Sequence, residues 1–261
     1  MLRTATRADL PLIRDIFARG NDLPYNPAAV AEEKAFGAGF RGAPRVRIFD
    51  EHGVAVTCGD VLRVLAVDRE HRGRGIGTAL LEDSKATTIA AEPGNYFVAG
   101  AANYDMVNWL TNRGYTLKSR TNDLWVEGLD AFEMPANVKR GNGRTLDWIE
   151  HHFGAIWRFE AARALEADPP TLFIIEYGGY LAGFAAHEAN NRGLGTFGPT
   201  GVASEFRGRG LGKALLHASL ADLRRLGYGR AIIPWTGAVD FYRKSAGARV
   251  GLDLAVMVAS R

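Results

Sequence analysis

The sequence has a single cysteine, Cys58, among its 261 residues, and no long apolar run. One cysteine excludes an internal disulfide, and its apolar surroundings, VAVTC, favour a small buried side chain over a nucleophile. A membrane-spanning helix needs about 18 or more consecutive apolar residues, which this chain lacks. The opening segment MLRTATRADL has no apolar stretch of the kind that a signal peptide requires. These absences predict a cytoplasmic protein with no membrane partner.

A large excess of charge of one sign is also missing. Lys and Arg number 32 and Asp and Glu number 29, which gives a formal net charge of +3. Nucleic-acid-binding proteins usually concentrate basic residues on one face, whereas the arginines here are spread along the chain except at two short turns. The composition therefore predicts no nucleic-acid partner, and the mild positive charge favours an anionic ligand.

The chain does contain an internal repeat. The segments EHRGRGIGTALL (70–81) and EFRGRGLGKALL (205–216) agree at 9 of 12 positions and lie 135 residues apart. The similarity continues upstream, where a strand, a polar turn and a helix with an i, i+3, i+7 apolar stripe occur in both halves. Two copies at this distance indicate a duplicated domain rather than a solenoid. We therefore expect an N-terminal domain over residues 1–130 and a C-terminal domain over residues 136–261.

Each half shows the same series of elements. A first strand is followed by two helical stretches, several β-rich runs separated by short turns, and an amphipathic helix over residues 75–90 or 210–226. A further strand (NYFVAGA or GRAIIPW) and a short helix come next. A hairpin would close each half, YTLKS with DLWVEG and ARVG with LDLAVMVA. The pattern predicts an α/β fold with two tandem domains, each a mixed, mostly antiparallel sheet flanked by helices.

The repeated turn has the residue types of an anion site. A helix start offers unpaired N–H groups and the positive end of the helix dipole. Glycines allow positive φ angles and a close approach of backbone to ligand, and arginines add charge-assisted contacts. Neither copy matches the P-loop or the Gly-x-Gly-x-x-Gly dinucleotide motif. The residues concerned are Arg72, Gly73, Arg74, Gly75 and Gly77 in the first copy, and Arg207, Gly208, Arg209, Gly210 and Gly212 in the second.

The segments LRVLAVDREHRGRGIGTALLE and GPTGVASEFRGRGLGKALLHA resemble motif A of the GNAT superfamily of acyl-CoA-dependent N-acetyltransferases. The downstream motif of that superfamily, Asn-x-x-Ala-x-x-Phe-Tyr followed by Gly, also occurs in each half, with departures. NYDMVNWLTNRGY keeps Asn103 but has Leu110 where the tyrosine belongs, whereas WTGAVDFYRKSAGA keeps Tyr242 but has Trp235 for the asparagine. The duplication is similar to the tandem arrangement of mycothiol synthase, whose chemistry belongs to the C-terminal half.

This resemblance implies how acetyl-CoA would bind. The fourth strand of each domain would end in a bulge and splay from the fifth, so that the pantetheine arm pairs with the fourth strand and the diphosphate lies on motif A. A backbone N–H near Val202 would polarise the thioester carbonyl. The residues that would contact acetyl-CoA are Val202, Ala203, Ser204, Arg207, Gly208, Arg209, Gly210, Leu211, Gly212 and Lys213 in the second half, and Val67, Arg72, Gly73, Arg74, Gly75, Ile76, Gly77 and Thr78 in the first.

The resemblance also implies acetyl transfer to a primary amine by direct attack in a ternary complex, with no metal and no covalent enzyme intermediate. Tyr242 would donate a proton to the departing thiolate, although it could instead only pack its helix against the sheet. Leu110 cannot donate a proton, which selects the second half as catalytic. The first half would bind acetyl-CoA without turnover or brace the second. Our candidate for the base that takes the proton of the amine is Glu188. The alternatives are His187, Asp240, Glu205 and transfer through water.

Two other functions are compatible with the motifs. A non-catalytic acyl-CoA-binding or sensing protein is the main alternative, and contact of the basic turns with nucleic acid is a third. The adjacent His151 and His152 point to different faces of a helix, so we expect no metal there. Trp148, Trp157 and His152 would shape the acceptor site or fill the core. The acceptor is a small-molecule or peptide amine that the sequence does not identify, and two halves in one chain favour a monomer.

Overall fold

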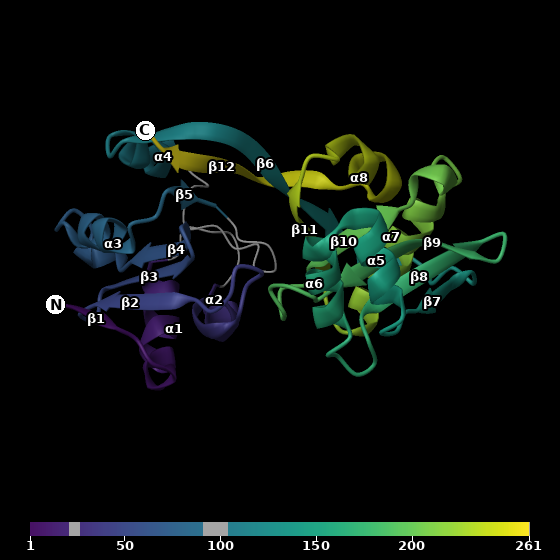
Figure 1. Cartoon of the computed structure of the whole chain (residues 1–261), viewed down its shortest axis with the longest axis horizontal. Coiled ribbons are helices and arrows are strands. Elements are labelled where there is room, and N and C mark those ends of the chain that lie inside the picture. Colours follow the sequence, from purple (N-terminus) through teal and green to yellow (C-terminus); the bar gives the residue numbers. More distant parts are fainter. Residues whose placement is uncertain (21–26, 91–103, 261) are drawn as a thin grey trace. The chain divides into compact units, whose positions relative to one another are not determined.

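The computed structural model describes residues 1–20, 27–90 and 104–260 (Figure 1). Contacts among residues divide the chain into two compact units. Unit 1 comprises Met1–Thr121 and Leu252–Arg261, and unit 2 comprises Asn122–Gly251. The predicted α/β fold class is confirmed, because the described strands form two mostly antiparallel sheets, of eight and four strands, that are flanked by helices.

Unit 1 is an antiparallel meander that continues into a parallel strand. Its elements are β1 (Leu2–Thr4), η1 (Arg7–Asp9), α1 (Leu10–Arg19), η2 (Pro27–Val30), α2 (Ala31–Phe36), β2 (Arg45–Phe49), β3 (Gly53–Cys58), β4 (Val61–Val67), η3 (Arg69–His71), α3 (Ile76–Ser84), β5 (Thr88–Ile89) and α4 (Tyr104–Thr111). Strands β1 to β4 pair antiparallel in order, and β5 pairs parallel with β4. The expected extension of α3 to residue 90 is wrong, because residues 88–89 join the sheet. The expected strand NYFVAGA and Asn103 lie outside the described residues.

Unit 2 repeats this order of elements. They are η4 (Leu129–Ala131), β7 (Val138–Arg140), α5 (Thr145–Phe153), α6 (Ala155–Ala164), β8 (Leu172–Tyr177), β9 (Tyr180–His187), β10 (Phe197–Val202), η5 (Ser204–Phe206), α7 (Leu211–Arg225), β11 (Arg230–Thr236) and α8 (Val239–Ala246). Strands β7, β8, β9 and β10 form a four-stranded antiparallel sheet, whereas β11 belongs to a different sheet. Strand β10, which precedes the glycine-arginine turn, and strand β11, which follows its helix, therefore do not form one continuous ladder.

Two long strands replace the two expected terminal hairpins. Residues Tyr115–Glu127 form the single 13-residue strand β6, and Arg249–Ala259 form the 11-residue strand β12. The mostly polar middle of β6, residues 116–121, is typical of a turn, but it is a largely exposed part of a continuous strand. Strand β6 begins in unit 1 and ends in unit 2, and β12 does the reverse. The ranges 1–130 and 136–261 therefore describe the sequence repeat, and as domain boundaries they stay a prediction.

The core of unit 2 lies on both faces of its four-stranded sheet. On one face, α7 buries a row of leucines that includes Leu215 and Leu216 against Phe173 and Ala185. A fully buried leucine stabilises a fold by about 1.5–3 kcal/mol, so this row fixes α7 firmly to the sheet. On the other face, α5 and α6 pack against the sheet, with Ile149 in their shared core. The position of the first turn of α7 relative to the end of β10 follows from this packing.

Candidate active site

The turn between β10 and α7 has the backbone geometry of an anion site. Gly208 and Gly210 have φ angles of +76° and +77°, which L-residues with a side chain rarely adopt. The Ala214 N–H donates to the Gly210 carbonyl at 3.1 Å, which is the first turn of the helix. The N–H groups of Leu211, Gly212 and Lys213 precede this bond and have no carbonyl within the helix to bind. The predicted contact residues of the second half thus surround one helix N-terminus.

The first copy of the turn in unit 1 has nearly the same hydrogen bonds. The Nε of Arg72 donates to the Val67 carbonyl at 3.3 Å, and the Nε of Arg207 donates to the Val202 carbonyl at 3.2 Å. In both copies the first arginine therefore fixes its turn to the end of the preceding strand. This is a structural role that the sequence analysis did not foresee. The Thr78 hydroxyl accepts from the Arg113 guanidinium at 2.9 Å, so a cation also lies at the first turn of α3.

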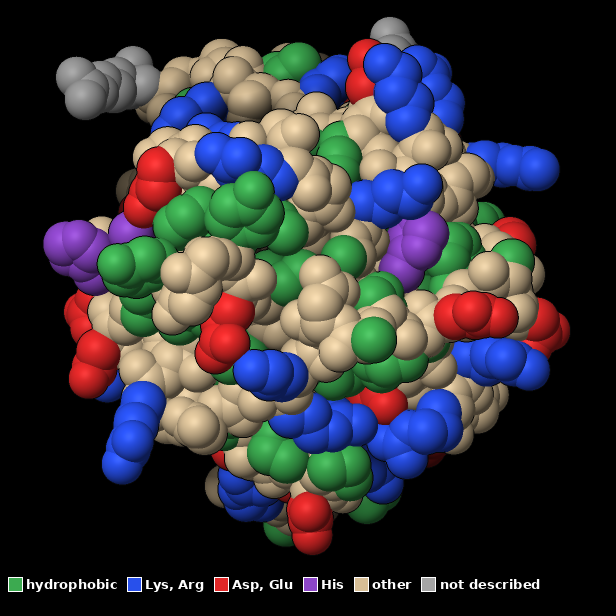
Figure 2. All heavy atoms as spheres, turned by 90° about the vertical axis from the view of Figure 1, so that its right-hand side faces the viewer, with side chains coloured by type: hydrophobic (Ala, Val, Ile, Leu, Met, Phe, Trp, Pro, Cys, Tyr) green, Lys and Arg blue, Asp and Glu red, His purple; other side chains and the backbone are tan. Residues whose placement is uncertain are grey.

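The second arginine and its neighbours in unit 2 reach toward solvent. The Arg209 guanidinium lies over the Tyr177 ring, 4.7 Å from its centroid. The Ser204 hydroxyl is 3.1 Å from a Glu205 carboxylate oxygen. Lys213 belongs to the first turn of α7 and adds a further positive charge at this helix end. On the face of the molecule drawn in Figure 2, basic side chains lie among acidic and apolar ones.

Strand β10 diverges from β11 as expected, but its bulge lies near its start and not at its end, where we expected it. Its pairing with β9 shifts register between Phe197 and Thr200, and Gly198, inside the shift, has a φ of +127°. Within the part of the chain that the structure describes, β10 and β11 are joined by a single bridge, between Thr196 and Ile232. Beyond this bridge β10 is a sheet edge. An extended ligand could pair with that edge as an additional strand.

The N–H of Val202 faces this open edge. The Ala203 N–H donates to the Ala182 carbonyl of β9 at 3.0 Å. Successive backbone N–H groups of a strand point to opposite edges, so the Val202 N–H points away from β9. Ala203 is the one predicted acetyl-CoA contact in unit 2 whose backbone donor is already used within the sheet.

Tyr242 lies beside the bulge. It is the buried residue of α8, with 7% of its surface exposed. Its ring meets the Phe197 ring edge-to-face at 6.0 Å between centroids. Burial raises the pKa of the Tyr242 hydroxyl to about 12, so the phenol keeps its proton at neutral pH. In unit 1, Leu110 is buried in α4 and offers no proton, which agrees with the asymmetry read from the sequence.

Glu188 is held by several hydrogen-bond donors. Its carboxylate accepts from the Gly193 N–H at 2.6 Å, the Thr196 N–H at 2.8 Å and the Tyr228 hydroxyl at 2.6 Å. These bonds fold the loop that leads into β10, so Glu188 has an evident structural role. Its assignment as the base stays a prediction.

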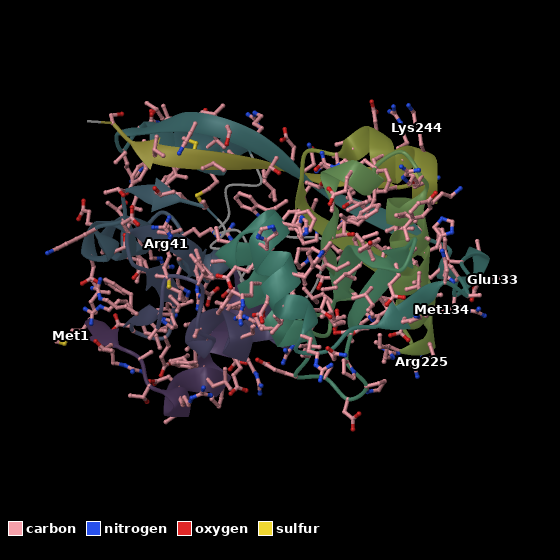
Figure 3. The ribbon with its side chains drawn as sticks, turned by 45° about the vertical axis from the view of Figure 1, so that its right-hand side comes forward. Met1, Arg41, Glu133, Met134, Arg225 and Lys244 are labelled. Carbon is pink, nitrogen blue, oxygen red and sulfur yellow. The ribbon has the colours of Figure 1, made fainter. Side chains whose placement is uncertain are left out.

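His187 belongs to a buried ion network. Its Nε2 lies 3.0 Å from the Asp222 carboxylate, which also accepts from Arg140 and Arg225. Burial opposes ionisation of Asp222, but His187 and the two arginines hold the pKa of this carboxyl well below its usual range. Arg225 is well separated from Lys244 of α8 in Figure 3. The network ties β7, β9 and α7 together.

Asp123 is a carboxyl group that the sequence analysis missed. It lies on β6, 2% exposed, and accepts the Trp235 N–H at 2.9 Å. Burial raises the pKa of Asp123 to about 7, against the effect of this hydrogen bond. Strand β11 bulges between Ile233 and Thr236, next to this contact. An acidic residue inside the apolar run DLWV was the available signal.

Aromatic side chains of α5 and α6 cover β10 on the face of the sheet that lies opposite α7. A Cβ atom at Gly201 would lie 2.7 Å from the Phe153 ring and 2.9 Å from the Trp157 ring, so only glycine fits there. These two rings stack at 5.2 Å between centroids and contact Phe184. Trp157 thus packs on the sheet. His152 lies 4.5 Å from Trp148 between ring centroids.

These features define a class of protein. Each unit has a meander, a glycine-arginine turn after its fourth strand and a helix that starts at that turn, which together form a tandem GNAT fold. The model of the acetyltransferase (GNAT) family matches residues 142–248, within unit 2. Residues 142–248 therefore form an acetyltransferase domain of the GNAT family. No curated protein matches the chain by sequence.

Solved structures share this fold over the whole chain. A GCN5-related glucosamine N-acetyltransferase region of a fungal multi-domain GH3 β-N-acetylglucosaminidase has a TM-score of 0.76 and 16% identity; the match covers 98% of this chain but 38% of that one. A GCN5-related N-acetyltransferase from Sphaerobacter thermophilus has a TM-score of 0.69 and 20% identity, covering 98% and 94%. A tandem GNAT protein from the clavulanic acid biosynthesis pathway has a TM-score of 0.69 and 15% identity, covering 99% and 98%. None of the described helices is both long and apolar enough to cross a membrane.

Proposed function

We propose that unit 2 is an acetyl-CoA-dependent N-acetyltransferase acting on a primary amine. The observation that carries this proposal is the arrangement along β10: an anion site at one end, an open edge next to it, and Tyr242 beside the bulge at the other end. The residues proposed to hold the diphosphate are Arg207 to Lys213. Val202 and Ser204 would meet the pantetheine arm. The first-half set, Val67 with Arg72 to Thr78, would bind a second molecule or only brace the fold.

The proposed reaction is a single displacement in a ternary complex. The amine nitrogen forms a bond to the thioester carbonyl carbon, and the carbon–sulfur bond breaks. The Tyr242 hydroxyl gives its proton to the departing thiolate, and a backbone N–H near Val202 stabilises the developing oxyanion. Much of the acceleration would come from holding the two reactants together.

Two of the candidates for the base that takes the proton of the amine, Glu188 and Asp123, can be compared by substitution. Glu188 follows from the sequence, and Asp123 is favoured by its pKa of about 7, close to the operating pH at which a base is most effective. We expect Asp123→Asn to remove a pH-dependent limb of kcat/KM near pH 7. Glu188→Gln should mainly lower stability. In either orientation of the amide, its NH₂ group would face a backbone N–H donor, that of Gly193 or that of Thr196. Loss of the limb in Glu188→Gln alone would instead assign the base to Glu188.

The role of Tyr242 can be tested by the release of free CoA in the presence of a panel of amines. The panel would include glucosamine, which the fungal neighbour's name suggests, together with amino acids and peptides. We expect Tyr242→Phe to lower kcat by about 10²-fold, the usual contribution of a general acid, with little change in acetyl-CoA affinity measured by calorimetry. Tyr180→Phe, at an exposed tyrosine of β9, is the matched control for a tyrosine substitution away from the proposed site.

The alternative function, a non-catalytic acyl-CoA-binding or sensing protein, predicts a different result. Such a protein would bind acetyl-CoA in the calorimeter but release no CoA with any amine of the panel, and Tyr242→Phe would change nothing. A protein that binds neither acetyl-CoA nor CoA would contradict both functions.

A further inference from the structure

Three potential metal ligands meet in unit 1. His52 lies in the turn between β2 and β3, Asp68 follows β4, and His71 belongs to η3. The Asp68 Oδ2 is 3.4 Å from the His71 Nδ1 and 4.0 Å from the His52 Nδ1. The two imidazole rings stack, with centroids 3.6 Å apart and planes 8° from parallel. All three ligand atoms lie within 4.8 Å of one another.

Both Nδ1 atoms are buried and have no hydrogen-bond partner. Buried polar atoms are normally satisfied, so two orphan nitrogens that face one carboxylate oxygen need an explanation. A metal ion supplies one, because neutral imidazole nitrogen and carboxylate oxygen are good ligands of divalent transition metals. Ligand atoms at bond lengths of about 2.0–2.2 Å around a tetrahedral Zn²⁺ lie roughly 3.3 Å apart; the Asp68 Oδ2 is 3.4 Å from the His71 Nδ1 and 4.0 Å from the His52 Nδ1. An imidazole binds a metal in its ring plane, so the two stacked rings would turn out of parallel to bind one ion.

We propose that His52, Asp68 and His71 form a binding site for a divalent transition metal, with Zn²⁺ as the best fit. Imidazole ligands disfavour Ca²⁺ and Mg²⁺, which prefer oxygen. The His52 and His71 side chains are 34% and 25% exposed, so an ion can enter from solvent and keep a water molecule as its fourth ligand. This metal site is a second function of the chain, and it has no role in the proposed acetyl transfer.

The second half of the chain provides an internal control. Ala203 and Phe206 occupy the positions of Asp68 and His71, and the glycine turn after β8 corresponds to the turn that bears His52. The same 3-10 turn forms in both halves: the His71 N–H donates to the Asp68 carbonyl at 2.9 Å, and the Phe206 N–H donates to the Ala203 carbonyl at 3.0 Å. The fold therefore does not require these ligand types at the turn.

Neighbouring groups orient the Asp68 carboxylate. The Arg19 Nε lies 2.9 Å from its Oδ2, and the Glu70 N–H donates to its Oδ1 at 3.2 Å. A carboxylate oxygen has two lone pairs, so Oδ2 can serve Arg19 and a metal together. Hydrogen-bonded partners of this kind commonly fix metal ligands. A bound ion would fasten the β2–β3 turn to the glycine-arginine turn of unit 1.

The test uses the full chain, freed of metal by a chelator and titrated with ZnCl₂ in a calorimeter. We expect one ion per chain, a higher melting temperature with Zn²⁺, and visible absorption when Co²⁺ replaces it. The variants Asp68→Ala and His71→Phe copy the residues of the second half, so they should keep the fold, and their Zn²⁺ affinity should fall by about tenfold or more. Far-UV circular dichroism checks that they fold.

The double variant His151→Ala/His152→Ala is the control for adventitious binding to exposed histidines, and it should bind Zn²⁺ like the natural chain. Unchanged affinity in Asp68→Ala and His71→Phe would overturn the proposal. So would loss of binding in the control variant, or no binding by the natural chain. The acetyl-transfer assay is not part of this test, so its outcome is independent of the proposed function.

Discussion

At the scale of single residues, two buried aspartates of unit 2, Asp123 and Asp222, differ in how easily they ionise. Asp222 is surrounded by partners that stabilise its charge, whereas Asp123 has one backbone donor and a buried position. The same residue type therefore ionises easily at one site and with difficulty at the other. The difference identifies Asp123, and not Asp222, as a carboxyl group able to exchange a proton near neutral pH.

Asp123 should make the stability of the protein fall as the pH rises. Below about pH 4 the carboxyl is protonated in both folded and unfolded chains; between pH 4 and 7 only the unfolded chain ionises, which favours unfolding. The difference between about 7 and the usual value of 3.8 corresponds to about 4 kcal/mol. We expect Asp123→Asn, whose amide oxygen can still accept the Trp235 N–H, to gain stability over the natural chain progressively across this range. Urea unfolding at several pH values measures it, and a constant difference at all pH values would show that Asp123 is not the titrating group.

At the scale of elements, the sequence predicts what is local and misses what depends on distant partners. The turn before α7 is encoded by neighbouring glycines and arginines, so its position and its likeness to the turn before α3 could be predicted from the sequence. The continuity of β6 could not, because its exposed middle is typical of a turn and its pairing is decided by β11 and β12. The contact of Asp123 with Trp235, 112 residues along the chain, is missed for the same reason.

The anion-binding role of the turn before α7 can be separated from its effect on stability with two glycines. Gly210 at the start of α7 and Gly227 just after its end have φ angles of +77° and +94°, and at neither would an added Cβ meet another atom within 4 Å. Substitution by alanine should cost about 1–2 kcal/mol of stability at either position. Only Gly210→Ala should also weaken acetyl-CoA binding, because it disturbs the N–H groups at the helix start. Equal loss of affinity in Gly227→Ala would show that the effect is one of stability alone.

For the molecule as a whole, the two compact units do not coincide with the two sequence repeats. The last strand of the chain completes unit 1, whose other strands come from the beginning of the sequence, and the end of β6 belongs to unit 2. A clean cut between the two sequence repeats would therefore remove a strand from each unit. Neither repeat alone contains all the strands of its unit, even though each carries a complete motif A.

Removal of residues 252–261 should consequently destabilise unit 1, although these residues follow the proposed catalytic half in the sequence. Leu254, Ala255 and Met257 are fully buried, and Met257 pairs with Ile89 of β5. Loss of the leucine and methionine side chains alone should cost about 3–6 kcal/mol. Amide hydrogen exchange should then become at least about tenfold faster in β3 and β4 and remain unchanged in β8 and β9. Removal of Arg261 alone is the control. Faster exchange in β8 and β9, with β3 and β4 protected as before, would mean that β12 stabilises unit 2 and that each sequence repeat folds as a continuous domain.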